Sequence, residues 1–494
     1  MVVDSCLENV WAVAVTISRL PSDRLIGNQP VAVTLGIDVA CRAAHQATFA
    51  VDGRPVWRGR QFFTRPAELD RLWEDLDLED PGELTVVVEP TRNAWMVLAQ
   101  WFRARGARVV MVPTTQSADL RAYYSKHAKN DRLDSEVLAR LPLLHPEGLR
   151  EFTGDGPADP LRRLVKQRST MVKRRTAIYS RLDALVELLG PAWHGVIGSD
   201  FGKADLALLA RYADPHTLIR LGAARLTRFL RIRSRGAFAE DRARALILAA
   251  KESLQLWGAD GIDFAELAAD IALEAEQALF LSEQIKEIDE RMANMYAEAD
   301  PAGIIASAPG VGPVTSAVIA GRLGDPHRFT SLAAIRAYSG LVPKVSQSGT
   351  REAEQGITKA GDPLLRELLF NAADHARKTD PQLAAKYVRL MSGDRHRDSA
   401  VCHLATNLLT RIATCWRTGQ PYVLRDVDGR EITEAEGRQI VKEQHKVDHK
   451  HRVAAAGRRM NQRRKQATDR ESQKSQSAPT SRPANTSIEA VEVA

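Results

Sequence analysis

Cysteines are scarce in this chain, and long apolar runs are missing from it. The 494 residues include four cysteines, and none of them forms a CxxC pair. Neither a disulfide framework nor a zinc knuckle is indicated, and scattered thiols are typical of a reducing cytoplasm. No stretch approaches the roughly 20 uninterrupted apolar residues of a membrane-spanning helix. The chain begins with acidic residues, Asp4 and Glu8, where a secretory signal would be basic. We therefore expect a cytoplasmic chain without membrane segments.

The overall composition is that of a globular protein. Apolar residues make up 44 % of the chain and charged residues 27 %, which excludes a mostly disordered chain. At roughly 150 residues per domain, the length favours about three domains.

The positive charge is concentrated in two segments. The net charge is +7, but residues 438–482 contain 13 Lys or Arg against 4 Asp or Glu, so the rest of the chain carries −2. A second basic segment, residues 161–189, has eight Lys or Arg and only two acids. Two basic segments on a near-neutral body indicate a polyanionic partner. Solvated helix faces and a solubilising tail are the alternative interpretation.

The first third of the chain predicts a mixed sheet with helices. Short apolar, β-branched runs are typical of buried strands, and spacings of three and four are typical of helices. Three strands in a row followed by alternating helix and strand indicate an α/β domain with a mixed sheet. We expect strands at 31–39, 45–51, 56–63, 84–88 and 108–112, and helices at 65–76 and 93–105.

Helices dominate the rest of the chain. Apolar residues at spacings of three and four predict long helices over 161–189 and 263–298, which favours a coiled coil or helical hairpin. The segment between them is irregular but helical, and we interpret it as an inserted subdomain. Residues 301–422 follow as a compact, mostly helical domain, and the end of the chain is rich in Ser, Gln, Thr and Pro, as in disordered segments.

Four carboxylates form a candidate metal site. Asp38 and Glu89 each end a predicted strand, and Asp131 and Asp134 lie three residues apart, on one face of a helix. Carboxylates that converge in this way suit Mg²⁺ or Mn²⁺, since hard cations prefer oxygen ligands. Two such ions can clamp the attacking and leaving oxygens of a phosphodiester displacement. The alternative is a capping Asp, a turn Glu and a solvated helical pair.

A glycine turn opens a helix near residue 310. Gly310 and Gly312 lie between prolines in the run from Ala308 to Pro313, and an apolar helix follows. This resembles the helix–hairpin–helix element of DNA-binding proteins, in which free N–H groups of the helix meet a phosphate. A dinucleotide-binding loop is the competing interpretation, but the segment 301–308 before the turn reads as helical and the third glycine is missing.

A polar loop carries a candidate nucleophile. Ser348 is followed by Gly349, which predicts an accessible serine. A serine that attacks phosphorus needs activation and stabilisation of the developing charge. On its own the serine is an ordinary loop residue. Four basic residues nearby are candidates for phosphate binding: Lys344, Arg351, Lys359 and Arg366.

These motifs together resemble one family, the insertion-sequence 110 group of transposases, also described as bridge-RNA-guided recombinases. The match covers roughly residues 31–425 in the family's order. The residues that carry it are Gly36-Ile37-Asp38, Val88-Glu89-Pro90-Thr91, Lys129-Asn130-Asp131-Arg132-Leu133-Asp134, Pro309-Gly310-Val311-Gly312-Pro313, Gln347-Ser348-Gly349 and Thr358-Lys359-Ala360-Gly361. Asn130 stands where many relatives have threonine.

The resemblance implies a fold and an active site. The fold would be an N-terminal domain like RNase H and RuvC resolvases, a coiled-coil region used in oligomerisation and a mostly helical C-terminal transposase domain. The four acids would be catalytic residues and ligands of Mg²⁺ or Mn²⁺. The serine nucleophile maps to Ser348, with Ser346 as the nearby alternative, and would form a covalent phosphoserine link to DNA. The family's active site is thought to combine acidic and serine domains of different subunits.

The domain boundaries follow from these patterns. The first and last segments and the insert lie outside the match to the family. We expect an extension at 1–30, the RNase H/RuvC-like domain at 31–150, the coiled-coil region at 151–300 with its helical insert at 199–261, the transposase domain at 301–425 and a basic, disordered tail at 426–494.

The function that we predict is that of an insertion-sequence transposase in the bacterial cytoplasm. Its partners would be DNA, a structured noncoding RNA that pairs with target and donor DNA, and further copies of the chain in a dimer or tetramer. Gly310, Gly312, Arg174 and Arg175 would contact nucleic acid together with the basic residues around Ser348. The alternatives are a resolvase-like nuclease that hydrolyses DNA with the acidic site alone and a non-catalytic nucleic-acid-binding protein.

Overall fold

A computed structural model of the chain divides into two compact units, residues 1–159 and 160–494. The described residues are 32–112, 131–144, 146, 149–154, 159–258, 261–348, 351–393 and 395–453. Of residues 131–133, 344–348 and 351–355 the structure describes the backbone alone. The predicted extension at 1–30 and the end of the predicted tail lie outside these ranges.

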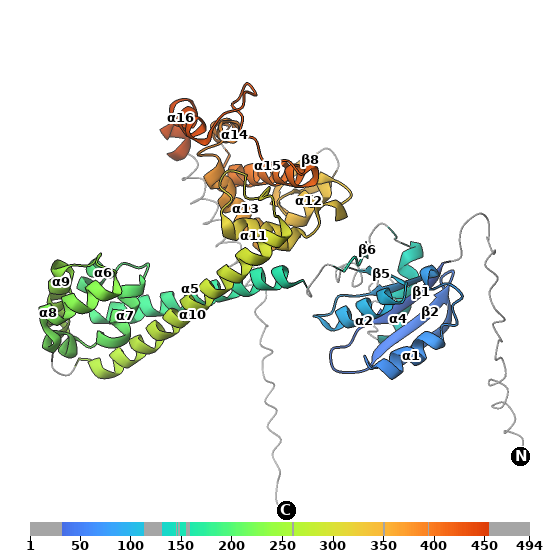
Figure 1. The fold of residues 1–494 in the computed structure, drawn as a ribbon, viewed down its shortest axis with the longest axis horizontal. Helices are drawn as coiled ribbons and strands as arrows, with labels where there is room; N and C mark the ends of the chain where they lie inside the picture. The colour runs from blue at the N-terminus through green and yellow to red at the C-terminus, as the bar shows by residue number, and fades with distance from the viewer. Residues whose placement is uncertain are drawn as a thin grey trace, which may run out of the picture. The chain divides into compact units, whose positions relative to one another are not determined.

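The first unit is built on a six-stranded mixed sheet (Figure 1). Its strand order is β3-β2-β1-β4-β5-β6. The pairs β1–β4 and β4–β5 are parallel, and the other neighbours are antiparallel. The predicted mixed sheet is thereby confirmed. The strands are β1 (Val33–Asp38), β2 (His45–Val51), β3 (Arg54–Phe62), β4 (Leu84–Val88), β5 (Arg108–Met111) and β6 (Arg150–Glu151).

Helices cover both faces of this sheet. Helices α1 (Pro66–Glu74) and α2 (Ala94–Ala104) bury Leu72 and Leu98 against one face, where Leu35 and Ile37 of β1 also lie. Helix α4 (Asp131–Leu144) packs on the other face, against Val87 and Val110 among others. Because side chains alternate along a strand, Thr34, Gly36 and Asp38 belong to the face that α4 covers.

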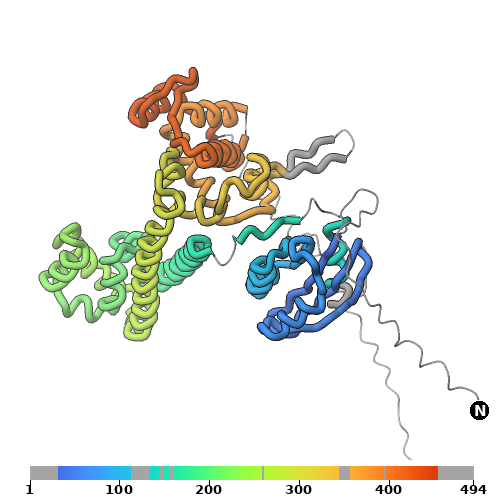
Figure 2. Tube along the Cα trace, turned by 45° about the vertical axis from the view of Figure 1, so that its right-hand side comes forward, coloured from blue at the N-terminus to red at the C-terminus, as the bar shows by residue number. Residues whose placement is uncertain are grey.

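The second unit begins with a long antiparallel helical hairpin. Helix α5 (Pro160–Leu189) and helix α10 (Phe264–Ala299) form its two arms, which lie along each other in Figures 1 and 2. Between them the chain forms α6 (Pro191–Val196), α7 (Lys203–Tyr212), α8 (Pro215–Arg233) and α9 (Glu240–Trp257). These four helices share an apolar core with the facing ends of α5 and α10. The predicted insert is therefore helical.

Polar residues hold the middle of the hairpin seam. The guanidinium of Arg168 forms a two-point ion pair with Asp289, with Nη2 at 3.2 Å from Oδ2. Seven residues further on, Arg175 Nη1 donates to Ser282 Oγ at 3.3 Å. A spacing of seven returns a side chain to the same seam of paired helices. The two arginines that interrupt the apolar repeat of α5 therefore still face the partner helix.

The remaining helices pack at the other end of the hairpin. Their core includes Leu164 of α5, Met292 of α10 and Leu408 of α15. The elements are α11 (Pro313–Leu323), η3 (Pro326–Arg328), α12 (Leu332–Ser339), β7 (Pro343–Ser348), β8 (Arg351–Ile357), α13 (Pro363–Ala376), α14 (Pro381–Ser392), α15 (Arg397–Thr418) and α16 (Glu434–Gln444). None of the helices in the described ranges is long and apolar enough to cross a membrane.

Three segments differ from what the sequence predicts. Residues 301–308 form turns instead of a helix, because Gly303 has a φ of 64° and the Asp300 carboxylate accepts the N–H groups of Ile304 and Ile305. The predicted loop around Ser348 is an antiparallel hairpin of β7 and β8. Helix α16 lies inside the predicted disordered tail, and Val447 beyond it is buried in the core.

Candidate active site

The two strand-end carboxylates lie at one edge of the sheet. Strands β1 and β4 are parallel and in register, with Ile37 opposite Val88. Asp38 and Glu89 are the next residue of each strand, and both are partly exposed. Strand alternation directs both toward the face that α4 covers, because Gly36 and Val87, two residues earlier, lie on that face.

Helix α4 brings the other two acids toward the same edge. Thr34 Oγ1 donates to the carbonyl of Ala139 at 2.8 Å. Two residues further along β1, a Cβ at Gly36 would lie 2.3 Å from the carbonyl oxygen of Ser135. Residue numbers thus rise along β1 while they fall along α4. The first turn of α4, with Asp131 and Asp134, therefore points toward the Asp38 end of β1.

Only a glycine fits at the crossing of β1 and α4. The same Cβ at Gly36 would also meet the backbone nitrogen of Ala139 at 2.3 Å, and backbone atoms cannot swing aside. The helix is further tied to the sheet by the 2.8 Å contact between the hydroxyls of Thr48 and Ser135. The glycine of the Gly36-Ile37-Asp38 motif thus sets how closely the acidic helix approaches the sheet.

A buried histidine holds the segment after Asp38. His45, at 4 % exposure, accepts the backbone N–H of Ala40 at Nδ1 over 3.1 Å. Its Nε2 lies 2.7 Å from Thr64 Oγ1. Because a backbone N–H can only donate, Nδ1 carries no proton and the ring is neutral. Burial also lowers the pKa of His45 below its ordinary value of 6.5.

The donor set at this edge suits a divalent cation. Asp134 is a carboxylate at 7 % exposure, and Asp38 and Glu89 approach the same edge from the strands. Isolated buried carboxylates are costly, whereas a hard cation neutralises them with oxygen ligands. Among the described side chains, which include those of Asp38, Glu89 and Asp134, no three metal-binding residues lie close enough together to hold one ion. The side chain of Asp131 lies outside them, so the complete predicted set is not on view.

Ser348 is the last residue of strand β7. Strands β7 and β8 pair with Ser348 opposite Arg351 and Ser346 opposite Ala353. Ser346 precedes Ser348 by two residues on the same strand. The side chains of Ser348, Lys344 and Arg351 lie outside the described set, and Lys359 is exposed just past the hairpin.

The base of this hairpin is fixed by two backbones in direct contact. A Cβ at Gly361 would lie 2.4 Å from the backbone nitrogen of Gly340 and 2.5 Å from the carbonyl oxygen of Tyr338. Arg366 Nη1 donates to the carbonyls of Ser339 and Lys359 at 3.2 and 3.3 Å. Arg366 thus clamps the two chain segments that enter and leave the hairpin.

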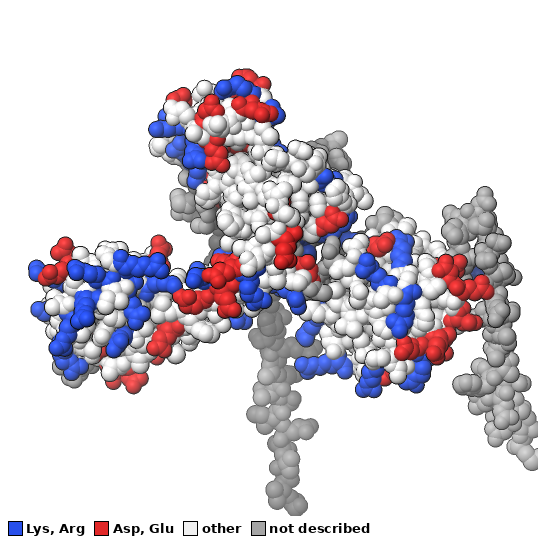
Figure 3. Space-filling view, viewed as in Figure 1, with Lys and Arg blue, Asp and Glu red and all other residues white. Residues whose placement is uncertain are grey.

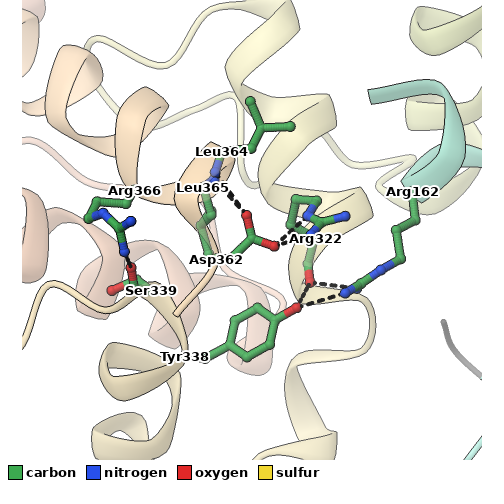
Figure 4. A network of polar contacts seen from close by, with 8 residues as sticks. All are labelled: Arg162, Arg322, Tyr338, Ser339, Asp362, Leu364, Leu365 and Arg366. Carbon is green, nitrogen blue, oxygen red and sulfur yellow. Dashed lines mark hydrogen bonds and ion pairs between the residues drawn. The ribbon is translucent and has the colours of Figure 1, made fainter. Parts of the chain in front are cut away.

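A polar network lies beside the contact between Arg366 and Ser339 (Figure 4). Asp362, with its side chain 3 % exposed, forms an ion pair with Arg322 and caps α13 by accepting the N–H groups of Leu364 and Leu365. The hydroxyl of Tyr338 donates to the carbonyl of Arg322 at 3.0 Å. Arg162 Nη2 lies 3.0 Å from that hydroxyl.

Sequence reasoning missed Arg162, Arg322, Tyr338 and Asp362 as residues that support the hairpin. The Asp362-Pro363 pair was a visible signal, since an Asp before Pro is typical of a helix start. No local pattern relates Arg162 to Arg322, which lie 160 residues apart.

The glycine turn at 310 has a packing role. Gly310 has a φ of 74°, and a Cβ there would lie 2.4 Å from the carbonyl oxygen of Ala372 in α13. Gly312 is exposed, has nothing within 4 Å of a Cβ and is the N-cap of α11. Gly310 is thus required by packing against α13, whereas Gly312 leaves the N-terminus of α11 open.

The two arginines that we single out on α5 face different ways. Arg175 is partly buried in the seam with Ser282, and its guanidinium lies 5.7 Å from the ring of Tyr179. Arg174 is exposed and lines a hollow of about 360 Å³ between α5 and α10. Of the two, Arg174 is the one accessible to a partner.

Comparison with known proteins gives matches to two family models. One, described as a transposase, matches residues 35–191, and one described as the IS116/IS110/IS902 transposase family matches residues 302–388. An insertion element IS110 protein of Streptomyces coelicolor is 25 % identical over 417 residues, 83 % of this chain and 100 % of its own length. An IS116 protein of Streptomyces clavuligerus is 27 % identical over 298 residues, 60 % of this chain and 72 % of its own. The transposase of IS1328 from Yersinia enterocolitica is 32 % identical over 136 residues, 27 % of this chain and 41 % of its own.

Proposed function

Because the chain belongs to the IS110 family of insertion-sequence transposases, we propose that it cuts and rejoins DNA through a covalent link between Ser348 and a DNA phosphate. The observation that carries the proposal is the approach of Asp38, Glu89 and the first turn of α4 to one edge of the sheet. The mixed sheet, in which β1, β4 and β5 are parallel, supports the fold that the resemblance to RNase H and RuvC resolvases implies.

The acidic residues would hold Mg²⁺ or Mn²⁺ beside the DNA phosphate that reacts. Asp38, Glu89, Asp131 and Asp134 would be the ligands. When bound, such a cation supplies positive charge that offsets the negative charge developing on the phosphate oxygens. The protein contributes the fixed positions of these carboxylates, since Gly36 seats α4 directly on β1.

Ser348 would act as the nucleophile. Its Oγ attacks phosphorus, a Ser–O–P bond forms, and the bond from phosphorus to one deoxyribose oxygen breaks. The serine proton leaves as the attack proceeds, and the released sugar oxygen takes up a proton. Attack by the hydroxyl of another DNA end reverses these changes and restores the serine, so that strands are exchanged without hydrolysis.

Basic residues and a guide would bring DNA to the site. Lys344, Arg351 and Lys359 on and beside the hairpin would bind phosphates, together with the open N-terminus of α11 at Gly312. A structured RNA encoded by the element would supply sequence recognition by base pairing. A dimer or tetramer of the chain would join acidic and serine sites from different subunits.

The test is a covalent-trapping assay. Purified full-length protein, Mg²⁺, the flanking noncoding RNA and labelled element-junction DNA are incubated and separated on a denaturing gel. We expect a protein–DNA adduct that disappears in Ser348→Ala and in Asp38→Asn, and that requires the RNA. Ser346→Ala and Asp70→Asn are the matched controls, because Ser346 lies two residues away on the same strand and Asp70 is an exposed acid of α1.

Three outcomes would contradict parts of the proposal. Loss of the adduct in Ser346→Ala alone would move the nucleophile to Ser346. Cleaved DNA without any adduct would favour a metal-dependent nuclease. DNA binding with neither cleavage nor adduct would favour a non-catalytic binding protein.

A further inference from the structure

The helical insert carries an unusual concentration of arginine. Residues 215–239 contain six arginines, at 220, 225, 228, 231, 233 and 235, and no Asp or Glu. All six side chains are exposed. Figure 3 shows Lys and Arg gathered over the end of the second unit that α6–α9 form. Neither family model covers this part of the chain.

Three of these arginines form a stripe along one side of α8. Helix α8 has a break at Gly222, where φ is 77° and ψ is 161°. In the part after the break, Arg225, Arg228 and Arg231 follow at spacings of three, which keeps them on one side of the helix over about 9 Å. Leu226 and Leu230 occupy the opposite side and are fully buried in the insert core. The core therefore fixes the direction in which the arginine stripe points.

No carboxylate among the described residues neutralises the stripe. Elsewhere in the insert the arginines are paired, Arg242 with Asp205 and Arg244 with Glu240. Like charges on neighbouring turns of a helix destabilise it. A repulsive stripe of this kind is relieved when a polyanion lies along it.

Its chemistry favours phosphate groups. Arginine presents a planar fork of donors that fits a phosphate at two points, and all six cations here are arginine. A phosphodiester backbone offers several charges over the length of the stripe, since duplex DNA carries about one charge per 1.7 Å. An anionic membrane would need apolar side chains beside the cations. Leu226 and Leu230 of α8 are buried, and Ile232 is the one large apolar side chain of this helix that is exposed.

We propose that the stripe of Arg225, Arg228 and Arg231 is a nucleic-acid backbone-binding site, separate from the acidic and serine sites. It would bind DNA or RNA by phosphate contacts, without reading sequence. The proposal does not depend on the serine chemistry, because a cleavage-inactive chain would still bind through the stripe.

The test measures binding by the full-length chain at several salt concentrations. The probes are a 40-base-pair DNA duplex of arbitrary sequence, an RNA duplex of the same length and vesicles with anionic lipid. In the triple variant R225Q/R228Q/R231Q we expect at least about tenfold weaker binding to DNA, RNA or both at 0.1 M salt, and a salt slope lower by about two to three. Whichever duplex loses affinity is the source of the phosphates.

The control is a triple variant with the same change in charge. Arg244, Arg425 and Arg438 are exposed but paired with Glu240, Glu431 and Glu434, so R244Q/R425Q/R438Q is expected to bind nearly as the wild type does. In the wild-type chain, bound duplex should also protect Arg225, Arg228 and Arg231 from phenylglyoxal, and leave Arg244 reactive. Equal losses in both variants, unprotected stripe arginines or an effect on vesicles alone would overturn the proposal. Thermal unfolding by circular dichroism checks that both variants are folded.

Discussion

Individual glycines decide how closely the functional segments approach one another. Gly36 allows α4 to pack directly on β1. Gly361 allows the residues before α13 to contact the end of α12. In each case the atom that a Cβ would meet belongs to the backbone, at 2.3–2.4 Å. Short motifs around Asp38 and Lys359 thus contain glycines for a packing reason, and the charged residues beside them depend on that packing for their positions.

Gly361→Ala should therefore disrupt the backbone contact at the base of the β7–β8 hairpin, which carries Ser348. Overpacking of a tight backbone contact costs about 1–3 kcal/mol, so we expect the urea midpoint of the second unit to fall clearly. Gly356→Ala is the matched control, since a Cβ there meets nothing within 4 Å and should change stability by less than about 0.5 kcal/mol. Equal midpoints for the two variants would show that the contact at Gly361 relaxes without cost.

His45 should make the first unit less stable in mild acid. Its folded pKa lies below the ordinary value of 6.5, so as pH falls below about 6.5 the unfolded chain binds a proton first. The contribution of the neutral His45 to the free energy of unfolding is complete above pH 6.5. It is lost as pH falls from 6.5 toward the lower pKa of the folded state. Urea titrations at pH 7.5 and 5.5, followed by tryptophan fluorescence, should show the loss. His45→Gln should flatten this dependence, whereas His216→Gln, an exposed control, should not.

At the scale of elements, the helical hairpin depends on polar pairs in its seam. Arg168 and Asp289 are partly buried and joined at two points, so we expect a coupling energy of about 1 kcal/mol in a double-mutant cycle with alanine. The exposed pair of Lys286 and Glu290 on α10 should give about 0.3–0.5 kcal/mol. A coupling at Arg168 no larger than this would mean that the Arg168–Asp289 pair stabilises the seam no more than an exposed ion pair does.

What the sequence predicts at this scale depends on periodicity. Buried strands such as β2 and β4, and long helices such as α5, are predicted within a residue or two because apolar side chains repeat along them. Where β7 and β8 form a hairpin, the sequence predicts a loop, because these two strands are mostly polar. The sequence predicts Arg175 on a basic face, whereas in the structure it contacts Ser282 in the hairpin seam. The two residues lie 107 positions apart in the chain. Contacts of this length leave no local pattern.

At the scale of the whole molecule, the two parts of the proposed chemistry belong to different units. Asp38, Glu89 and α4 lie in residues 1–159, and Ser348 lies in residues 160–494. The apolar cores follow the same division, since residues up to Phe152 and residues from Leu161 on never share a core cluster among the described residues. Each unit therefore has its own core, and the proposed reaction requires groups from both kinds of unit to come together at one DNA phosphate.

This division makes a mixing experiment decisive for how the site is assembled. Neither Asp38→Asn nor Ser348→Ala should form an adduct alone, because each chain lacks one of the reacting groups. If acidic and serine sites of different subunits combine, a mixture of the two variants contains some sites with an intact Asp38 from one chain and an intact Ser348 from the other. We expect such mixtures, co-expressed so that subunits exchange, to recover part of the wild-type adduct in the trapping assay. A site built within one chain would leave the mixture inactive, because no single chain carries both groups.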